Sequence, residues 1–482
     1  MPPRAAHHPA SSHDPHTPSP ANPAAAPFNR APRLHLHLPS SPITADALRR
    51  RFDALPYAHL AFRQQLGLPT DRPLILTGHQ PGFFHPGILA KYLAARALAH
   101  RTAAAAAMLV VDHDAAEPLA LSLPSSLDPD RLPTPIPLHL GSPLPLGAAA
   151  ESLPAIPDPT PTPTLPAHLP EPVRRATDRA LAALRDAATD PRSTNAALQA
   201  ALANAHLLDI HPLGPLIPSS RLPHTDLFRS LVARLADEPA ALLAFNRAVA
   251  AHPSAGVAPL AGVHHDRTDH NPELPLWRLD PHGRRLPLRL DHLASTPPDR
   301  LRPRALLMTG LLRLAACELF IHGTGGAAYD RATDHWFQHW LGSPLPAPVL
   351  TASADLYLPS EPTEPATPAD LAAADYLAHH ARHSPAALDL HADEAERRRL
   401  VAAIDAAPDE PARYAAFRNL HDFLANYRQR HADRLALLDR HRRRLHHIAR
   451  WRRSNQGRTW PAFLYPTQLL NQLDQAITNH LA

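Results

Sequence analysis

The stretch PLILT-GHQPGFFHPG-ILAKYLAARALAH (Pro73–His100), followed by AAMLVV-DHD (Ala106–Asp114), decides the fold class of this chain. The short apolar run Pro73–Thr77 predicts a strand, the segment rich in Gly and Pro predicts a loop, and the Ala- and Leu-rich run Ile88–His100 predicts a helix. A second apolar run, Ala106–Val111, predicts another strand. A strand, a loop, a helix and a strand in succession indicate a βαβ unit, and therefore an α/β protein with a parallel sheet.

The length of 482 residues exceeds one domain of ordinary size. Pro is abundant at 59 residues while Gly is scarce at 16, so some segments are linkers rather than packed elements. We expect a disordered Pro/His-rich tail (1–40), the first part of a Rossmann-like core (41–122), a Pro-rich insertion with connecting helices (123–204), the remainder of the core (205–360) and a C-terminal helical coiled-coil region (361–482).

Outside the βαβ unit, Thr44–Leu66 predicts one helix that starts near Thr44 or Asp46 and ends at Gly67. The Pro-dominated stretch Leu123–Pro172 predicts an insertion that runs over the surface without helix or central strand. Further helices are expected at Val173–Ala188, Thr194–Leu207, Thr225–Ala251 and Ala305–Ala316, and further strands at Leu276–Leu279, Leu286–Leu290 and Glu318–Ile321.

From Ala369 onward the pattern is helical, and apolar residues recur at spacings of three and four, or sums of these, between Phe417 and Ile448. A long helix with such an apolar seam needs a partner. The partner is either another helix of the same chain or a second copy, and we expect a homodimer that forms through these C-terminal helices.

Composition excludes several classes of protein. The single cysteine, Cys317, rules out an internal disulfide and a Cys-based zinc cluster, and its apolar surroundings favour a buried thiol. The N-terminus lacks a signal-peptide pattern, and no window approaches the roughly 20 apolar residues of a membrane helix. We therefore expect a cytoplasmic protein without a membrane partner.

Two charged segments have an ordinary interpretation. The net charge of +4 is spread along the chain, and only Arg440–Arg453 resembles a basic stripe for nucleic acid. A solvated helix face is the favoured interpretation of this stretch, and we do not expect nucleic acid as a partner. His264–His270 has the composition of a metal site, but consecutive ligands on one loop rarely satisfy a coordination geometry, so we predict a polar loop and assign no metal ligand.

Three of the predicted strands end in polar, acidic or glycine-containing segments: Thr77–Gln80, Asp112–Asp114 and His322–Gly326. Ligands of open α/β sheets bind outside the carboxyl ends of the strands, so we expect the site where these segments meet. Glycines allow backbone amides to approach an anion, and the helix after Gly87 would direct its N-terminus at that anion.

The candidate catalytic residues are His79, His85, Asp112 and Asp114. The histidines can stabilise charge on a phosphate or transfer protons, or they simply bond local carbonyls. The carboxylates can hold Mg²⁺, orient a substrate ammonium or bond a ribose; alternatively, Asp114 caps a helix and Asp112 is solvated. Lys91 is the only lysine in the chain, which favours a role for a compact ammonium over a surface position without function.

The other candidate binding residues lie in the same segments. They are Gly78, Gln80, Gly82, His113, His322, Thr324, Gly325 and Tyr329, which together with Lys91 would bind a small-molecule substrate or a nucleotide.

These segments resemble the cysteine-adding enzymes of bacillithiol biosynthesis. TGHQPGFFHPG (Thr77–Gly87) is similar to that family's TGQQPGLFTGP, VDHD (Val111–Asp114) to its EDHD, and GTGGAAY (Gly323–Tyr329) to its GGPGEIAY. His79 stands in place of a Gln, and Gly326 in place of a Glu. The residues that fall on the family pattern are Gly78, Gln80, Pro81, Gly82, His113, Asp114, Gly325 and Tyr329.

The resemblance implies a Rossmann-like core, connecting insertions and a C-terminal coiled coil used for dimerisation. It implies ligation of a cysteine carboxyl group to the amine of glucosaminyl malate with nucleotide-assisted activation, and hence ATP or a related nucleotide, with Mg²⁺, as cofactors. The departures from the pattern favour a relative with another amine or acid substrate. The second hypothesis is a non-catalytic dimeric scaffold with a degenerate pocket, and a nucleic-acid-associated protein ranks third.

Overall fold

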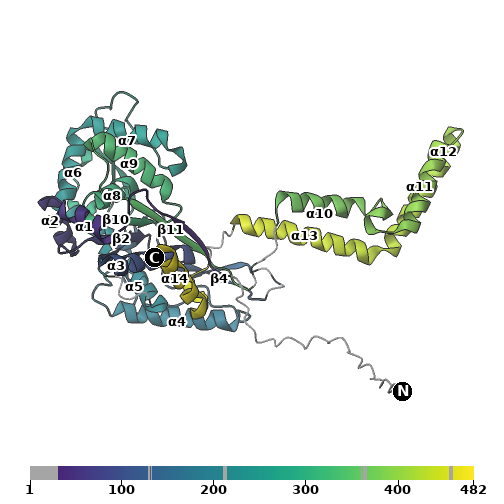
Figure 1. Cartoon of the computed structure of the whole chain (residues 1–482), viewed down its shortest axis with the longest axis horizontal. Helices are drawn as coiled ribbons and strands as arrows, with labels where there is room; N and C mark the ends of the chain where they lie inside the picture. Colours follow the sequence, from purple (N-terminus) through teal and green to yellow (C-terminus); the bar gives the residue numbers. More distant parts are fainter. Residues whose placement is uncertain are drawn as a thin grey trace, which may run out of the picture.

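The computed structural model describes residues 31–128, 131, 133–209, 214–359, 361, 366–454 and 460–482. Figure 1 shows a mixed α/β body with a helical arm, residues 368–454, that projects away from it. No helix within the described ranges is long and apolar enough to cross a bilayer.

A mostly parallel sheet forms the centre of the body, and in the described part of the chain it has six strands in the order β1-β11-β10-β2-β3-β6. All neighbouring strands are parallel except β1, which pairs antiparallel with β11 at one edge. The chain builds β3 and β6 on one side of β2, and later returns to add β10 and β11 on the other side. The strands are β1 (Arg33–His37), β2 (Leu74–His79), β3 (Ala105–Val110), β6 (Leu216–Pro218), β10 (Leu319–His322) and β11 (Val349–Asp355).

Helices cover both faces of this sheet, and the period-two alternation of the strands divides their side chains between two cores. On one face, Ile75 and Val110 pack with α3 (Pro86–Thr102), α5 (Ala196–Leu208) and α14 (Thr467–Leu481). On the other face, Leu74, Leu76 and Leu109 pack with a second group of helices. That group consists of α2 (Tyr57–Leu66), α6 (Asp226–Asp237), α7 (Pro239–Ala251), α8 (Ala305–Leu311) and α9 (Ala327–Leu341).

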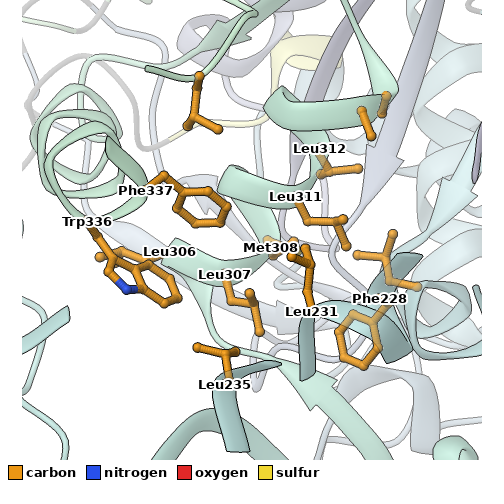
Figure 2. Close-up of a cluster of buried hydrophobic side chains, with 14 of the residues drawn as sticks. Phe228, Leu231, Leu235, Leu306, Leu307, Met308, Leu311, Leu312, Trp336 and Phe337 are labelled. Atoms are coloured by element: carbon orange, nitrogen blue, oxygen red, sulfur yellow. The ribbon is translucent and has the colours of Figure 1, made fainter. Parts of the chain in front are cut away.

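The second core is dense in leucine and aromatic side chains. Figure 2 shows Phe228 and Leu231 of α6 on one side of Leu307 and Leu311 of α8, and Trp336 of α9 on the other side of Leu307. The indole nitrogen of Trp336 donates to the carbonyl of Ala241 at 2.9 Å, so this large side chain is buried without an unpaired polar atom.

The predicted βαβ unit is confirmed as β2, α3 and β3, with shifted boundaries. Strand β2 continues through Gly78 and His79, where the glycine- and proline-rich pattern predicts a loop. Helix α3 begins at Pro86 rather than Ile88, because proline suits the first helical position, where its missing amide hydrogen would have no helical partner.

The predicted tail, 1–40, is wrong over its last part, because Arg33–His37 forms β1. Leu34 and Leu36 pack against the α3 side of the core, while His35 pairs with Asp355 at 2.8 Å. This alternation was hidden by the Pro- and His-rich composition of the segment before it, and residues 1–30 of the prediction lie outside the described residues.

Proline divides two of the predicted helices. Thr44–Leu66 contains α1 (Ala45–Asp53) and α2, with Pro56 immediately before the second helix; the expected N-cap Thr44 and the left-handed stop at Gly67 are confirmed. Thr225–Ala251 is likewise divided between α6 and α7, which starts at Pro239. A proline has no amide hydrogen to continue the previous helix, but it fits the first turn of the next one.

The stretch Leu123–Pro172 supplies no strand to the central sheet, as predicted, but the prediction that it only runs over the surface is wrong. Its first part belongs to an antiparallel hairpin of β4 (Ala120–Pro124) and β5 (Pro135–His139). Leu123 and Leu138 are buried there against α4 (Glu171–Ala188) and α5. Prolines are tolerated because, among the described residues, these two strands form a sheet of their own, and each has an outer edge that does not need their missing amide hydrogens.

The predicted hairpin around Asp280–Gly283 is confirmed and lies outside the central sheet. Strands β7 (Glu273–Leu279), β8 (Arg285–Arg289) and β9 (Leu301–Pro303) form a separate antiparallel sheet. The carbonyl of Gly283 accepts a hydrogen bond from the amide of Ala149 at 2.9 Å, which joins this sheet to the segment after the β4–β5 hairpin.

In the arm, the predicted apolar seam is divided between α12 (Glu410–Arg430) and α13 (Ala432–Ser454). Helix α13 lies antiparallel to α10 (Pro368–His380), and α12 lies beside α11 (His391–Asp405). Leu424, Tyr427 and Leu435 are buried with Ala381 and Leu388, so this part of the seam finds its partner within the same chain. Helix α14 then returns to the body and packs on α3.

Candidate functional site

The carboxyl ends of β2 and β10 meet at Lys91, which lies on the second turn of α3. Its Nζ donates to the carbonyl oxygen of Gly78 at 2.5 Å, and its Cδ lies 3.8 Å from where a Cβ on Gly323 would be. The side chain is only 2% exposed, and this burial lowers the pKa of Lys91 to about 7. The amine and the ammonium form are therefore both populated near neutral pH, and an anion placed beside Lys91 would favour the charged form.

His79, at the end of β2, lies within electrostatic range of Lys91. Desolvation holds the pKa of His79 well below its usual value, and the Lys91 cation lowers it further, with smaller contributions from His85 and His322. Its Nδ1 lies 2.9 Å from the carbonyl oxygen of Gln80, so in the neutral ring Nδ1 donates. The lowered pKa favours the neutral form of His79, and its hydrogen bond to a neighbouring carbonyl is one of the two alternatives that the sequence left open.

His85 is the N-cap of α3. Its Nδ1 accepts from the amide of Gly87 at 3.1 Å, and its carbonyl accepts from the amides of Ile88 and Leu89 at 2.9 and 3.1 Å. Since Pro86 has no amide hydrogen, the first donors of the helix are occupied. The predicted anion site at the N-terminus of this helix is therefore closed in the structure.

His85 also borders a cavity of about 320 Å³ between the loop after β2 and the β4–β5 hairpin. Phe83, Leu121 and Leu138 supply apolar walls, and His139 adds a polar group. The other predicted catalytic residues do not line this cavity.

His322, at the end of β10, pairs with Asp330 in the first turn of α9, and its Nδ1 lies 2.8 Å from Oδ2 of Asp330. A Cβ on Gly326 would lie 2.4 Å from the imidazole ring, so the ring packs directly on the backbone at this position. The turn between β10 and α9 holds Thr324 and Gly325. Tyr329 is partly buried against the α8–α9 core.

The structure contradicts a ligand-binding role for Asp112. The residue is fully buried, and its Oδ1 accepts from the Ser219 hydroxyl and the Ser220 amide, both at 2.9 Å. Its Oδ2 accepts from the Ser220 hydroxyl at 2.6 Å and from Asn195 at 3.4 Å. Because these donors use the lone pairs that a cation would need, Asp112 and Asp114 do not fit a paired Mg²⁺ site.

His113 belongs to the same buried network. Its Nδ1 lies 2.6 Å from Oγ of Ser219, and because the Ser219 hydroxyl donates to Asp112, His113 must donate to Ser219. Burial lowers the pKa of His113 to about 4, so the ring stays neutral at pH 7. The hydrogen bonds of this network connect the residues after β3 to the segment after β6, so Asp112 and His113 have a structural role.

Asp114 links distant segments of the site. It accepts from the side-chain amide of Gln80, from Nη1 of Arg285 at 2.8 Å, and from the Ala115 amide at 2.7 Å. About a fifth of its side chain is exposed, at 21%. Asp114 thus ties the loop after β2 to the β7–β8 hairpin and remains accessible from one side.

Two glycines of the first motif have structural roles. A Cβ on Gly78 would lie 2.6 Å from the Cβ of Leu109 on the neighbouring strand. Gly82 has a φ of 131°, where side chains are disfavoured, and its carbonyl accepts from Asn204 at 2.9 Å. Asn204 also accepts from the Phe84 amide at 2.9 Å, so this part of the motif is fixed by α5.

Several charged or polar residues near the site were not predicted from the sequence. Arg302 forms paired bonds of 2.6 Å with Glu151, whose pKa is raised by burial. Ser219 and Ser220 follow the short strand β6, so the reasoning from strand ends could have found them. Arg285, Arg302 and Glu151 lie outside the central sheet, and no local pattern marks them.

Where the chain is described, no group of three or more His, Cys, Asp or Glu side chains is placed to hold a metal ion. The buried thiol predicted for Cys317 is confirmed, and burial raises its pKa. No protein-family model matches this chain, and a search of curated proteins finds no match.

Proposed function

We propose that this chain is a nucleotide-assisted carbon–nitrogen ligase that joins a small carboxylate, such as cysteine, to the amine of a sugar-derived or similar small molecule. The observation that carries the proposal is the position of Lys91. It is the only lysine in the chain, it is buried, and it lies between the carboxyl ends of β2 and β10. An amine in such a position is costly to bury, and a bound anion would offset that cost.

The order of the strands supports a Rossmann-like assignment for the core. The strands up to β6 are added on one side of β2, and the strands from β10 onward are added on its other side, so the strand order reverses between β2 and β10. Open α/β sheets bind ligands outside the carboxyl ends of the strands at such a switch point. Three candidate residues lie near this switch point: Lys91, His79 and His322. A nucleotide phosphate held there would have the Lys91 ammonium as its cation.

The remaining roles follow from which groups are accessible. Asp114, held by Gln80 and Arg285, is the carboxylate best placed to orient a substrate ammonium. His79 is a neutral hydrogen-bonding group beside Lys91. The nucleotide, when bound, would supply the phosphoryl or nucleotidyl group that activates the substrate carboxylate.

Thermal unfolding in the presence of ATP, ADP and AMP tests this proposal, because a ligand that binds only the folded state raises the melting temperature. We expect stabilisation of the natural chain, loss of that stabilisation in Lys91→Met, and retention in Arg96→Met. Arg96 lies on the same helix and pairs with Asp474 at the surface. If no nucleotide stabilises the natural chain, the ligase proposal is withdrawn.

The second candidate is a dimeric scaffold that keeps the fold without catalysis. It is favoured by the closed N-terminus of α3, where His85 accepts from Gly87, and by Asp112, whose carboxylate is occupied by protein donors. A scaffold predicts no nucleotide response and no effect of Lys91→Met on any ligand. The same unfolding series therefore separates the two functions.

We also propose that the chain forms a homodimer through the arm. Tyr376, Tyr414 and Phe417 are large side chains of the arm that stay 63%, 65% and 49% exposed. Burial of exposed aromatic side chains is a common source of association energy between protein surfaces.

A further inference from the structure

We propose that His322 and Asp330 form an oriented acid–base pair, in which His322 is the catalytic base that accepts a proton from the attacking amine and Asp330 is its positioning residue. This inference rests on the proposed ligase function for its substrate. The pair itself rests on geometry that can be measured in the protein alone.

The orientation of the imidazole follows from its hydrogen bond. Nδ1 lies 2.8 Å from a carboxylate oxygen of Asp330, and a carboxylate only accepts, so Nδ1 carries the hydrogen. In the neutral ring, Nε2 then carries the lone pair. Within the described part of the chain Nε2 has no protein partner, and the His322 side chain is 24% exposed, so this nitrogen can reach a ligand.

The carboxylate is more deeply buried than the imidazole, and its oxygen that faces away from His322 has no hydrogen-bond donor among the described residues. Asp330 is only 4% exposed, and the guanidinium of Arg313 lies 3.9 Å from its other oxygen. Arg313 is itself fixed by the Ala347 carbonyl at 3.1 Å and by Asp334 at 2.7 Å. A buried charge supported in this way can offset the positive charge that His322 gains when it accepts a proton.

Backbone packing restricts the ring as well. The imidazole lies on Gly326, where a Cβ would approach its atoms to 2.4 Å, and it meets Phe320 edge to face at 5.4 Å between centroids.

The pair lies where the proposed reaction needs a base. His322 ends β10, the neighbour of β2, and lies close enough to His79 for the two imidazoles to disfavour simultaneous protonation. In the reaction, the lone pair of the substrate amine forms a bond to the carbonyl carbon of the activated acid. The carbon–oxygen bond to the phosphoryl group breaks, and the phosphate leaves with that electron pair. Nε2 of His322 takes the proton that the new amide nitrogen loses.

His113, by contrast, is 3% exposed and donates to Ser219, so it lacks access to a substrate. The His446–Asp375 pair has a similar length, at 2.9 Å, but lies on the arm, with its side chains 44% and 46% exposed. It is therefore a matched control for a His–Asp pair without a site.

Two measurements on the full chain test the pair without a substrate. Imidazole ¹⁵N chemical shifts report the tautomer of His322, assigned by comparison with His322→Gln. Carbethoxylation by diethyl pyrocarbonate reports the reactivity of its ring, and the tryptic peptide Leu314–Arg331 contains His322 as its single histidine. Asp330→Asn and Asp375→Asn are compared with the natural chain.

We expect the Nδ1–H tautomer in the natural chain and in Asp375→Asn, and a shift toward Nε2–H in Asp330→Asn. The carbethoxylation rate of His322 should fall by roughly tenfold or more in Asp330→Asn, because its exposed nitrogen then carries the hydrogen. If Asp330→Asn does not fold, Gly326→Ala replaces it, since the added methyl group displaces the ring from Asp330.

An Nε2–H tautomer in the natural chain, or an unchanged carbethoxylation rate in the variant, overturns the inference. The nucleotide unfolding series is read separately. A positive tautomer result without any nucleotide response would leave the oriented base established and remove only the ligase reaction.

Discussion

The Nζ atom of Lys91 lies 2.5 Å from the carbonyl oxygen of Gly78, beneath the carboxyl end of the central strand β2. This contact satisfies one of the three hydrogens of an ammonium group. The side chain is otherwise enclosed, and burial lowers its pKa to about 7 from a usual value of 10.5. Lys91 therefore destabilises the folded chain on its own, which is typical of residues kept for binding or catalysis.

Replacing Lys91 with Met should stabilise the protein. Between pH 7 and pH 10.5 the unfolded chain binds a proton at Lys91 that the folded chain does not bind. Lys91 therefore lowers the free energy of unfolding most below about pH 7, and this loss disappears as the pH rises past 10.5. We expect Lys91→Met to be more stable at pH 7 by about 4 kcal/mol, and by about 1 kcal/mol at pH 10. Urea unfolding at both pH values measures this, with Arg96→Met as the control. Equal stability of variant and natural chain at pH 7 would show that Lys91 is not desolvated.

Nucleotide binding should depend on pH for the same reason. An anion beside Lys91 favours the ammonium form, so binding takes up a proton when the free protein holds the neutral amine. We expect the affinity for ATP to fall by up to about tenfold per pH unit above pH 7. Calorimetry in two buffers of different ionisation enthalpy at pH 7.5 detects the proton uptake. Binding without proton uptake would place the nucleotide away from Lys91.

Acid should destabilise the fold through His113. The pKa of its ring is about 4 in the folded chain, against an ordinary value of 6.5, so the unfolded chain binds the extra proton as the pH falls from 6.5 to 4. The neutral ring contributes fully to the free energy of unfolding above pH 6.5. That contribution, on the order of 2–3 kcal/mol, is lost as the pH falls from 6.5 to 4. Urea unfolding from pH 7 to pH 4 gives the slope. His113→Gln should flatten it, whereas substitution of the exposed His265 should leave it unchanged.

Substitutions of Asp112 and Asp114 should have different effects, on folding at Asp112 and on ligand binding at Asp114. Asp112→Ala leaves the donors of Ser219, Ser220 and Asn195 without an acceptor, and we expect a loss of about 3 kcal/mol in unfolding free energy. Asp114→Asn keeps a hydrogen-bonding side chain at a part-exposed position, so folding should persist while binding of the amine substrate is lost. Melting temperatures of both variants, and the stabilisation of Asp114→Asn by candidate amines in the presence of ATP, measure the difference. An Asp112 variant with natural stability would contradict the structural role given to that residue.

If the homodimer forms through the arm, substitution of exposed aromatic side chains of the arm should weaken the dimer. The double variant Tyr414→Ser, Phe417→Ser removes two exposed aromatic side chains of α12 and should shift the chain toward the monomer in sedimentation velocity. Tyr57→Ser is the control, because Tyr57 is 85% exposed on the body. If the double variant and the control sediment alike, the arm is not the dimer interface.

The elements that the sequence predicted well are those with strong local patterns. The run Pro73–Val111 determined a strand, a helix and a strand, because apolar period and glycine-rich loops act over a few residues. It also determined that polar segments follow β2, β3 and β10. The short strand β1 and the proline-rich hairpin β4–β5 were missed, since pairing with distant segments stabilises them against an unfavourable composition.

Only the tertiary structure decided which polar groups remain available. Asp112 and Asp114 are separated by one residue in the sequence, yet one is saturated by serines that follow β6 and the other faces Arg285 from a separate sheet. Asp330 pairs with His322 because α9 folds back over the end of β10. Hydrogen-bond partners and desolvation depend on long-range packing, so the sequence located the edge of the sheet while the fold selected Lys91 and the His322–Asp330 pair.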